Sequence, residues 1–226
     1  MKNLFLSYNI NLTDAQLNLF EKYYQLLIKY NGMFNLTAIT EREEVYLKHF
    51  IDSVLYVDNL VGDKLIDVGS GGGFPAIPIK ILREDIEVTL LEATRKKCEF
   101  LKTVIKELNL KNINVINARA EEIAKDNNFR EKFDICSARA VARLNTLCEY
   151  CMPFVKVGGT FVALKGNVTE ELEQAQNAIK VLGGKLDKLL TYTVDNAQRA
   201  LVYVKKIKNT DKKYPRGQGK ERKSPL

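Results

Sequence analysis

The stretch LIDVGSGGGFP, residues 65–75, decides the fold of this chain. An apolar run ends abruptly at a cluster of glycines, and a helix-compatible segment follows. Glycine adopts positive φ at little cost and lets a ligand approach the backbone, while the amides at the start of the next helix offer donors and a partial positive charge. The pattern therefore predicts a strand, a tight turn and a helix that together bind a nucleotide-like ligand.

Three kinds of nucleotide-binding loop end a strand with glycines, and the residues after the last glycine separate them. A P-loop requires Gly-Lys-Ser/Thr, but Phe74 and Pro75 follow here. The dinucleotide fingerprint requires a small residue at position 74, so that helix and strand can pack closely. The remaining pattern, D-x-G-x-G-x-G over residues 67–73, is typical of Rossmann-like methyltransferases that bind S-adenosylmethionine. A plain tight turn between strand and helix is the alternative.

Length and composition suit one folded α/β domain with an appendage. The chain has 226 residues, of which 46% are hydrophobic, and this is enough for a core and excludes disorder throughout. No run of eighteen apolar residues occurs, and the N-terminus lacks the basic and apolar regions of a secretion signal. We therefore expect a cytoplasmic protein with no membrane partner.

The four cysteines predict buried free thiols. Cys98 and Cys136 lie in apolar periodic segments. Cys148-x-x-Cys151 has no second pair of ligands that would complete a zinc site. Free cysteine is among the most often buried residue types. We therefore predict no metal centre in this chain.

The net charge of +7 is concentrated at the C-terminal end. Residues 205–226 hold nine Lys or Arg against two acidic residues, so the charges of the remaining chain cancel. A short basic segment with Gly, Pro and a single aromatic residue cannot bury a core, and its favoured ligand is a polyphosphate backbone. We predict that residues 209–226 form a basic tail that grips RNA outside the catalytic centre. A tail that only aids solubility is the alternative.

Two amphipathic helices are predicted before the glycine loop. Residues 13–16 have the form of a capping box, and apolar residues then recur at helical spacing as far as Asn31-Gly32. A second capping box at residues 40–43 predicts a helix through about Asn59. Because neither helix belongs to a strand–helix repeat, we predict that residues 1–60 form a helical extension that shapes the substrate side.

From Lys64 the pattern alternates between strands and helices, which indicates a mainly parallel sheet covered on both faces. Two final β-rich runs have no helix between them, so we expect an antiparallel hairpin. The predicted strands are 65–68, 88–92, 113–117, 133–137, 160–166 (after a turn at Gly158-Gly159), 186–194 and 199–207. Residues 61–208 are thus predicted to form a Rossmann-like class I α/β methyltransferase domain with a seven-stranded sheet.

An acidic residue ends the second predicted strand. Glu92 lies 25 residues beyond Asp67, near the interval at which an acidic side chain meets ribose hydroxyls. A carboxylate at this position also disfavours a 2′-phosphate. Thr94 follows in a position to cap the next helix. We therefore add Glu92 to the predicted cofactor site on physical grounds.

Motifs along almost the whole chain occur in the order found in one family. They are Phe34–Ile39, Lys48–Ser53, Asp67–Pro75, Ser137–Ala142, Ala163–Gly166, Lys213–Gly217 and Lys223–Leu226. In these segments the chain resembles the ribosomal small subunit methyltransferase G family, also called glucose-inhibited division protein B. The resemblance implies a Rossmann-like enzyme that uses S-adenosylmethionine to methylate N7 of one guanine in a decoding-site loop of bacterial 16S ribosomal RNA. Gly72 departs from many members, which carry another small residue or proline there.

The resemblance also implies roles for individual residues. Gly69, Phe74, the pair Ala120-Glu121 and Arg139 match positions of the family that contact the cofactor. With the other loop residues and Glu92, the predicted cofactor-binding set is Asp67, Gly69, Gly71, Gly73, Phe74, Glu92, Ala120, Glu121 and Arg139.

Methyl transfer to guanine N7 requires little chemistry from the protein. The cofactor sulfonium carries the reactivity, and N7 is a lone pair with no proton to lose, so no general base is needed. We interpret His49, the one histidine, as an orienting or packing residue. Arg139 and Lys165 follow strands at the carboxyl edge of the sheet, where they can meet an RNA phosphate or guanine O6. Together with His49 and Asn35, they are our substrate-side candidates.

Two other classes of function stay open. One is an RNA-binding protein that keeps the cofactor without turnover. The other is a methyltransferase for a different RNA base or a small molecule. The missing Asn/Asp-Pro-Pro-Tyr segment disfavours amino-group methylation, and Cys136 lies inside a strand, where it cannot serve as the nucleophile of a cytosine-C5 enzyme. We expect a monomer that acts on 16S ribosomal RNA or on a small-subunit ribosomal particle.

Overall fold

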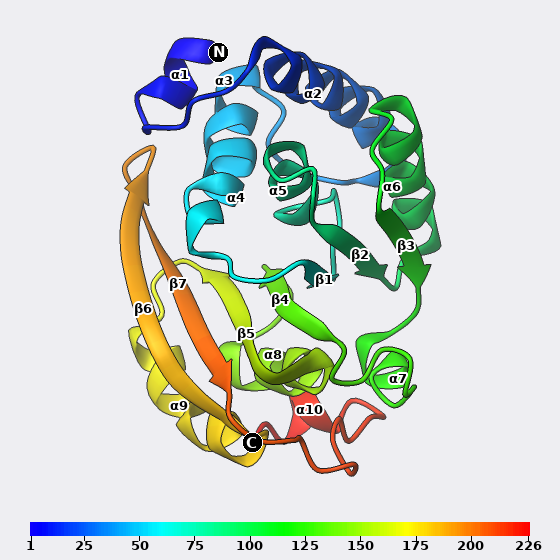
Figure 1. Cartoon of the computed structure of the whole chain (residues 1–226), viewed down its shortest axis with the longest axis vertical. Coiled ribbons are helices and arrows are strands. Elements are labelled where there is room, and N and C mark those ends of the chain that lie inside the picture. Colours follow the sequence, from blue (N-terminus) through cyan, green and yellow to red (C-terminus); the bar gives the residue numbers. More distant parts are fainter.

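A single seven-stranded sheet runs through the computed structural model, which describes residues 1–226 (Figure 1). Its strands are β1 (Lys64–Val68), β2 (Glu87–Glu92), β3 (Ile113–Asn117), β4 (Phe133–Arg139), β5 (Val155–Lys165), β6 (Gly184–Val194) and β7 (Ala197–Lys206). The spatial order is β3-β2-β1-β4-β5-β7-β6, with β1 to β5 parallel and β7 antiparallel to both β5 and β6. The predicted parallel sheet with a terminal hairpin is confirmed.

Helices cover both faces of this sheet, as Figure 1 shows. The helices before the first strand are α1 (Lys2–Leu6), α2 (Asp14–Phe34), α3 (Arg42–Val45), the π-helix η1 (Tyr46–Ile51), α4 (Asp52–Val54) and the 3₁₀ turn η2 (Val57–Asn59). The later helices are α5 (Ala76–Leu82), α6 (Arg95–Glu107), α7 (Ala120–Ile123), α8 (Leu144–Cys151), the 3₁₀ turn η3 (Met152–Phe154), α9 (Thr169–Val181) and α10 (Lys220–Lys223).

The two faces of the sheet belong to two separate hydrophobic clusters. Because successive strand residues point to opposite faces, Leu65 enters one cluster and Ile66 the other. The Leu65 cluster includes side chains from α5, α6 and the helices before β1, among them Phe20 and Phe50. The Ile66 cluster includes side chains from α8, α9 and Tyr214 near the C-terminus. The N-terminal extension therefore shares its hydrophobic core with the sheet.

The first predicted helix is confirmed with its cap. Gln16 N–H donates to Thr13 Oγ1 at 3.2 Å, and Thr13 N–H donates to Gln16 Oε1 at 3.0 Å. Helix α2 continues past the expected stop at Asn31-Gly32 and ends at Phe34, and its C-cap Asn35 takes a left-handed conformation with φ of 49°. Asn31 stabilises the following loop, since its Oδ1 accepts from the amides of Leu36 and Thr37. The short helix α1 was not predicted.

The second predicted helix was wrong in two respects. Its N-cap is Glu41 without a side-chain cap bond, so the expected capping box does not form. The helix also does not run evenly to Asn59, because residues 46–51 form a π-helix and the helical run stops at Val54. A π-helical segment widens the turn by one residue and often occurs at functional sites. Here it carries Lys48 and His49.

The turn predicted at Gly158-Gly159 is instead part of a strand. Strand β5 begins at Val155, and its pairing with β4 is shifted between Phe133 and Ile135. A Cβ atom added to Gly159 would lie 2.6 Å from the carbonyl oxygen of Asp134, so only glycine permits this close approach. The glycines therefore mark a β-bulge, which the sequence does not separate from a turn.

The basic C-terminal segment is folded onto the domain, which corrects the prediction of a tail unable to bury residues. Tyr214 is 8% exposed and Glu221 is fully buried. Lys206 is also buried, and its Nζ donates to the Met152 carbonyl at 2.7 Å and to Thr210 Oγ1 at 2.6 Å. Burial lowers the pKa of Lys206 to about 8, against the opposing effect of Glu131. Part of the basic charge is thus structural.

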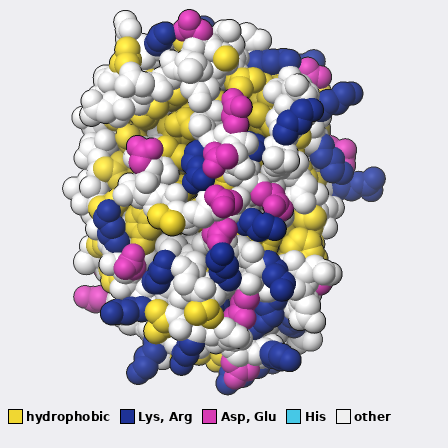
Figure 2. Space-filling model, in the orientation of Figure 1, with side chains coloured by type: hydrophobic (Ala, Val, Ile, Leu, Met, Phe, Trp, Pro, Cys, Tyr) yellow, Lys and Arg dark blue, Asp and Glu magenta, His cyan; other side chains and the backbone are white.

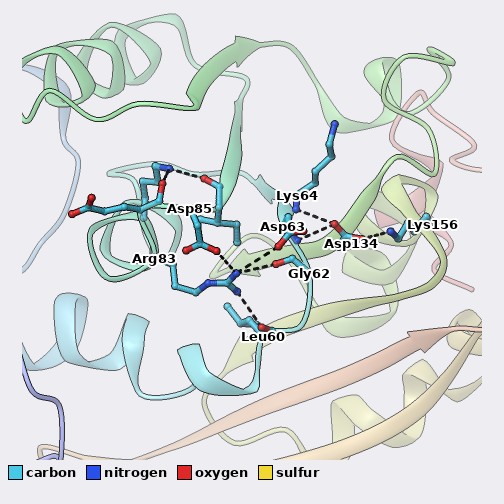
Figure 3. A network of polar contacts seen from close by, with 11 residues as sticks. Leu60, Gly62, Asp63, Lys64, Arg83, Asp85, Asp134 and Lys156 are labelled. Atoms are coloured by element: carbon cyan, nitrogen blue, oxygen red, sulfur yellow. Dashed lines mark hydrogen bonds and ion pairs between the residues drawn. The ribbon is translucent and has the colours of Figure 1, made fainter.

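A polar network closes the amino end of the sheet, opposite the glycine loop (Figure 3). Arg83 donates to the carbonyl oxygens of Leu60 and Gly62, at 3.1 and 3.2 Å, and so ties α5 to the end of the helical extension. Asp134 accepts from the amide of Lys64 at 2.9 Å. This network orders the entry into β1 and leaves the carboxyl end of the sheet open for a site.

All four cysteines are free and buried, as predicted. Burial raises the pKa of Cys148 to about 12, so this thiol is protonated at neutral pH. No group of three or more His, Cys, Asp or Glu side chains is placed to share a metal ion. No helix combines the length and apolar character that crossing a membrane requires.

Candidate cofactor and substrate site

Two neighbouring cavities lie at the carboxyl end of the sheet and share Gly69. The first has a volume of about 540 Å³ and is lined by the helical extension, the glycine loop, the ends of β4 and β5, and the β6–β7 hairpin. The second, of about 370 Å³, is lined by the ends of β1 and β2, the start of α7, Val141, α8 and the C-terminal segment. The strand order reverses between β1 and β4, which is where ligands bind in open α/β sheets.

The glycine loop uses its amides internally. Gly69 and Ser70 donate to the Leu91 carbonyl at 2.8 and 3.2 Å, and Gly73 donates to the Ser70 carbonyl at 2.7 Å. The Gly71 amide donates to Glu92 Oε2 at 2.9 Å. These four amides are therefore bonded within the protein, whereas the donors expected for a ligand were the amides at the start of the next helix. The loop instead contributes close backbone approach, because it presents almost no side-chain bulk to the two cavities.

Three glycines of the loop have different reasons to lack a side chain. Gly69 has φ of +74°, and an added Cβ would lie 2.7 Å from Val141 Cγ2 in the loop after β4. Gly73 has φ of +95°, and its Cβ would lie 2.5 Å from the Tyr23 hydroxyl. At Gly71, with φ of +56°, the nearest atom would be 3.8 Å away, and this residue lines the first cavity. Gly69 and Gly73 thus permit packing, while Gly71 keeps the cavity open.

Asp67 keeps a buried, unpartnered carboxylate oxygen beneath the loop and lines neither cavity. The side chain is fully buried, and Oδ1 accepts from Ser137 Oγ on the adjacent strand at 2.7 Å. Oδ2 has no hydrogen-bond partner. Burial raises the pKa of Asp67 to about 7, while the hydrogen bond from Ser137 opposes this shift. A cationic donor such as an amino group would satisfy the orphaned oxygen.

Glu92 holds the loop in addition to ending β2. Its Oε1 accepts from the Thr94 amide at 2.7 Å, and its Oε2 accepts from the Gly71 amide. Thr94 occupies the N-cap position of α6 but makes no side-chain cap bond, so the predicted cap is absent. Each carboxylate oxygen keeps a second lone pair, which leaves Glu92 able to accept from a ribose hydroxyl as well.

A stack of rings forms one wall of the first cavity. His49 lies over Phe74 with 4.6 Å between ring centroids, and Tyr23 stacks on Phe74 at 5.4 Å. The guanidinium of Arg139 lies 5.0 Å from the centroid of the Phe74 ring. Phe74, His49 and Arg139 all line this cavity, so the structure brings these three predicted residues together.

Arg139 joins the sheet to the helical extension. Its Nη1 donates to the Lys48 carbonyl at 3.2 Å and to Asp52 Oδ2 at 3.3 Å, and its side chain is 16% exposed. Asp52 Oδ1 accepts from the hydroxyl of Tyr192 at 3.0 Å and lies 3.7 Å from Nε of Arg199. The carboxylate of Asp52 therefore connects the extension, β4 and the hairpin at one point.

His49 has polar partners at both ring nitrogens. Nδ1 lies 3.3 Å from Arg139 Nη2, which can only donate, and 3.1 Å from the Lys48 carbonyl oxygen, which can only accept, so these two contacts favour opposite tautomers. Nε2 lies 2.8 Å from Thr37 Oγ1, a hydroxyl that can donate or accept. Burial and the charge of Arg139 lower the pKa of His49 to about 3. At neutral pH the ring is uncharged and held at both nitrogens.

Two other substrate-side candidates have different surroundings from those expected. Lys165 lines the first cavity, but its Nζ lies 2.6 Å from Glu171 Oε2 and donates to the Ala142 carbonyl at 2.9 Å. Its charge is therefore partly neutralised. Asn35 is exposed, ends α2 and lines neither cavity, so the structure does not bring it to the site.

The second cavity contains the pair after β3. Ala120 and Glu121, which the family resemblance assigns to the cofactor site, line it together with Arg119. Its remaining walls come from apolar side chains, Tyr150 of α8, and two residues of the C-terminal segment, Gly219 and Arg222. A mainly apolar cavity with a few polar groups at its edge suits a flat heteroaromatic ring.

Several residues of the site were missed by sequence reasoning. Asp52 lies three positions after His49, within the motif Lys48–Ser53 that the sequence analysis singled out. In a helix this spacing places both side chains on the same face, so it could have indicated that Asp52 belongs to the site. Tyr192 and Arg199 are paired across the hairpin, so only its register brings them to the first cavity. Arg222 gave no signal, because an exposed basic residue in a basic segment has no distinguishing pattern.

One family of known proteins matches most of this chain. The family model described as rRNA small subunit methyltransferase G, GidB, matches residues 16–209. A ribosomal RNA small subunit methyltransferase G from Lachnoclostridium phytofermentans is 49% identical over 226 residues, covering 97% of this chain and 93% of that protein. One from Acetivibrio thermocellus is 47% identical over 224 residues, with coverages of 97% and 92%.

A solved structure supports the fold alone. A SAM-dependent methyltransferase from Aquifex aeolicus superposes with a TM-score of 0.56 at 14% identity, covering 75% of this chain and 96% of that one. The fold is thus that of S-adenosylmethionine-dependent methyltransferases. With the matched family model and the identity of its relatives, the chain belongs to the rRNA small subunit methyltransferase G family.

Proposed function

We propose that this protein transfers a methyl group from S-adenosylmethionine to N7 of a guanine in 16S ribosomal RNA. The observation that carries the proposal is the pair of cavities that meet at Gly69, in a chain of the rRNA small subunit methyltransferase G family. One cavity can hold a cofactor while the other receives a base, so donor and acceptor meet at the glycine loop.

The second cavity is the proposed adenosine end of the cofactor site. Its apolar walls and Glu121 suit an adenine ring, and Glu92 at the end of β2 suits a ribose. The unpartnered Oδ2 of Asp67 supports an amino group nearby, as the methionine end of this cofactor has. When bound, S-adenosylmethionine supplies a methyl group on a sulfonium, and a neutral thioether leaves.

The first cavity is the proposed guanine site. Phe74 and His49 offer a ring stack against which a base can lie, and Lys97 and Arg199 add positive charge around it. The charge of Lys48 is partly neutralised by Glu44 and Asp195. These residues bind and orient, since N7 has no proton to remove. The low pKa of His49 agrees with this, because a ring kept neutral by burial and by the charge of Arg139 needs no change of protonation during the reaction.

RNA is the substrate class that the family implies, and we assign the 16S molecule or a small-subunit particle as the specific partner. Figure 2 shows Lys and Arg side chains gathered over the lower part of one face, where Figure 1 places β6, α9 and the C-terminal segment, with acidic side chains between them. Such a surface suits a phosphate backbone. We further propose a cytoplasmic, monomeric enzyme.

The test is to map N7-methylguanine in 16S RNA from cells with and without the gene, and then to supply purified protein and tritiated S-adenosylmethionine. We expect one modified guanine to be lost in the deletion strain and restored by the protein. Transfer to another base would show a different RNA methyltransferase. Binding of cofactor and RNA without transfer would show the non-catalytic alternative.

A further inference from the structure

We infer that the C-terminal segment is a wall of the cofactor cavity and that Arg222 binds the adenine end of the cofactor. This rests on the proposed function, and it differs from the prediction that the basic tail lies outside the catalytic centre. Gly219 and Arg222 line the second cavity together with Glu121 of α7 and Tyr150 of α8. Figure 1 shows α10 beside α8 and near α7.

The segment is fixed in place well before it reaches the cavity. Arg130 donates through Nη2 to the Thr210 carbonyl at 2.8 Å and through Nη1 to the Tyr214 carbonyl at 3.0 Å. Arg216 then forms a two-pronged contact with Glu149, from Nε to Oε1 at 2.9 Å and from Nη2 to Oε2 at 2.7 Å. Because Glu149 is fully buried, this contact is shielded from solvent.

A second set of bonds holds the segment beside the cavity itself. Thr146 Oγ1 donates to the Glu221 carbonyl at 2.9 Å, and the carboxylate of Glu221 accepts from the Gly217 amide. Thr146 and Glu149 lie on the same helix as Tyr150, which lines the cavity. Helix α8 therefore positions both its own wall residue and the segment that carries Arg222.

The chemistry of Arg222 fits an adenine ring. Most side chains of the second cavity are apolar, and they leave a flat ring with few polar partners. A guanidinium is planar, stacks on aromatic faces and donates in the plane to ring nitrogens. Arg222 can thus both stack on the ring and donate hydrogen bonds to it. It does so from the wall of the cavity that the C-terminal segment forms, outside the Rossmann-like sheet and its helices. Neighbouring Lys223 is exposed and lines neither cavity.

The experiment measures binding of S-adenosylhomocysteine and of adenosine by calorimetry to full-length wild type, Arg222→Ala, Arg222→Lys and the control Lys223→Ala. We expect Arg222→Ala to weaken both ligands by the same factor, between about threefold and thirtyfold. Arg222→Lys should recover only part of the loss, because it keeps the charge but not the plane. Lys223→Ala should bind both ligands as wild type does. Arg222→Gln replaces Arg222→Ala if the latter does not fold.

The outcomes separate this inference from the proposed function. Wild type that binds neither ligand would contradict the methyltransferase assignment itself. Wild type that binds both, with Arg222→Ala unchanged, would overturn only the role of Arg222. Equal losses in Arg222→Ala and Lys223→Ala would also overturn it, because they would show a general effect of charge. A loss for S-adenosylhomocysteine but not for adenosine would place Arg222 away from the adenine end.

Discussion

The carboxylate of Asp52 and the guanidinium of Arg139 join the helical extension to the carboxyl end of β4, with 3.3 Å between Oδ2 and Nη1. Neither residue is near the other in sequence, and both line the first cavity. The side chain of Asp52 is only 5% exposed, so the pair is largely shielded from water. This contact fixes how the extension closes over the glycine loop.

Substitution of Arg139 tests that contact. We expect Arg139→Ala to lower kcat/KM for RNA methylation at least tenfold, because it removes a cavity wall and leaves Asp52 without its main cation; tenfold corresponds to about 1.4 kcal/mol. Arg143→Ala removes an exposed arginine four residues later and should leave kcat/KM unchanged. Steady-state assays with tritiated cofactor measure both. Wild-type turnover in folded Arg139→Ala would remove Arg139 from the site.

His49 makes stability depend on pH in a predictable direction. Its folded pKa of about 3 lies below the ordinary value near 6.5, so the unfolded chain binds the extra proton first as pH falls. The stability that the neutral His49 ring contributes is therefore fully present above about pH 6.5 and is lost as the pH falls towards 3. Between pH 7 and pH 5, wild type should lose up to about 2 kcal/mol more than His49→Gln, with some discount for solvent screening. Denaturant unfolding at both pH values measures this difference, which belongs to the only histidine in the chain. Equal losses would show that His49 is protonated in the folded protein.

Asp67 makes stability depend on pH in the opposite direction. Its folded pKa of about 7 lies above the ordinary value near 3.9, so the folded state holds the proton more tightly, and stability falls as pH rises from about 4 to 7. Between pH 5 and pH 8 the ligand-free wild type should lose about 2 to 3 kcal/mol more than Asp67→Asn. The same variant should bind S-adenosylhomocysteine more weakly, because an amide nitrogen cannot accept. Unchanged affinity would show that Oδ2 has no role in binding.

Alanine substitutions at two glycines of the loop should have different effects, one mainly on ligand binding and the other mainly on the stability of the fold. Gly71→Ala adds a methyl group that narrows the first cavity, with no protein atom closer than 3.8 Å, so it should weaken RNA binding at a cost of only about 1 to 2 kcal/mol for the left-handed backbone. Gly73→Ala places its methyl group 2.5 Å from the Tyr23 hydroxyl and should mainly lower stability. Thermal unfolding and calorimetry on the same samples distinguish the two. Equal stabilities with equal affinities would contradict this division.

The exposed cations of the C-terminal segment should set the salt dependence of RNA binding. Lys208, Lys212, Lys220 and Lys223 are exposed, whereas Lys206 and Arg216 have buried partners. Replacing these four lysines by alanine should shrink the slope of log affinity against log salt by about 3 units, at ~0.7–0.9 per phosphate contact. Affinity for S-adenosylhomocysteine should not change. An identical slope would place the RNA contact elsewhere, for example on the exposed lysines of α6.

The sequence by itself determined the fold and the position of the glycine loop. Alternating strand and helix patterns specify a parallel sheet, and the D-x-G-x-G-x-G spacing specifies the turn after β1, because backbone conformation at each glycine is a local property. The family resemblance, read from local motifs, singled out Phe74, Ala120 and Glu121, which line the cavities in the structure. Their positions follow from the carboxyl ends of strands that were themselves predictable.

Tertiary structure alone decided which distant side chains meet. Two of these contacts join residues far apart in the chain: Asp52 with Arg139, and the C-terminal segment with α8. A third, Tyr192 opposite Arg199, depends on the register of the hairpin strands. A basic tail and a folded basic segment have the same composition. What distinguishes them is the buried Glu149 that receives Arg216, and a partner 67 positions away leaves no local signal at either residue.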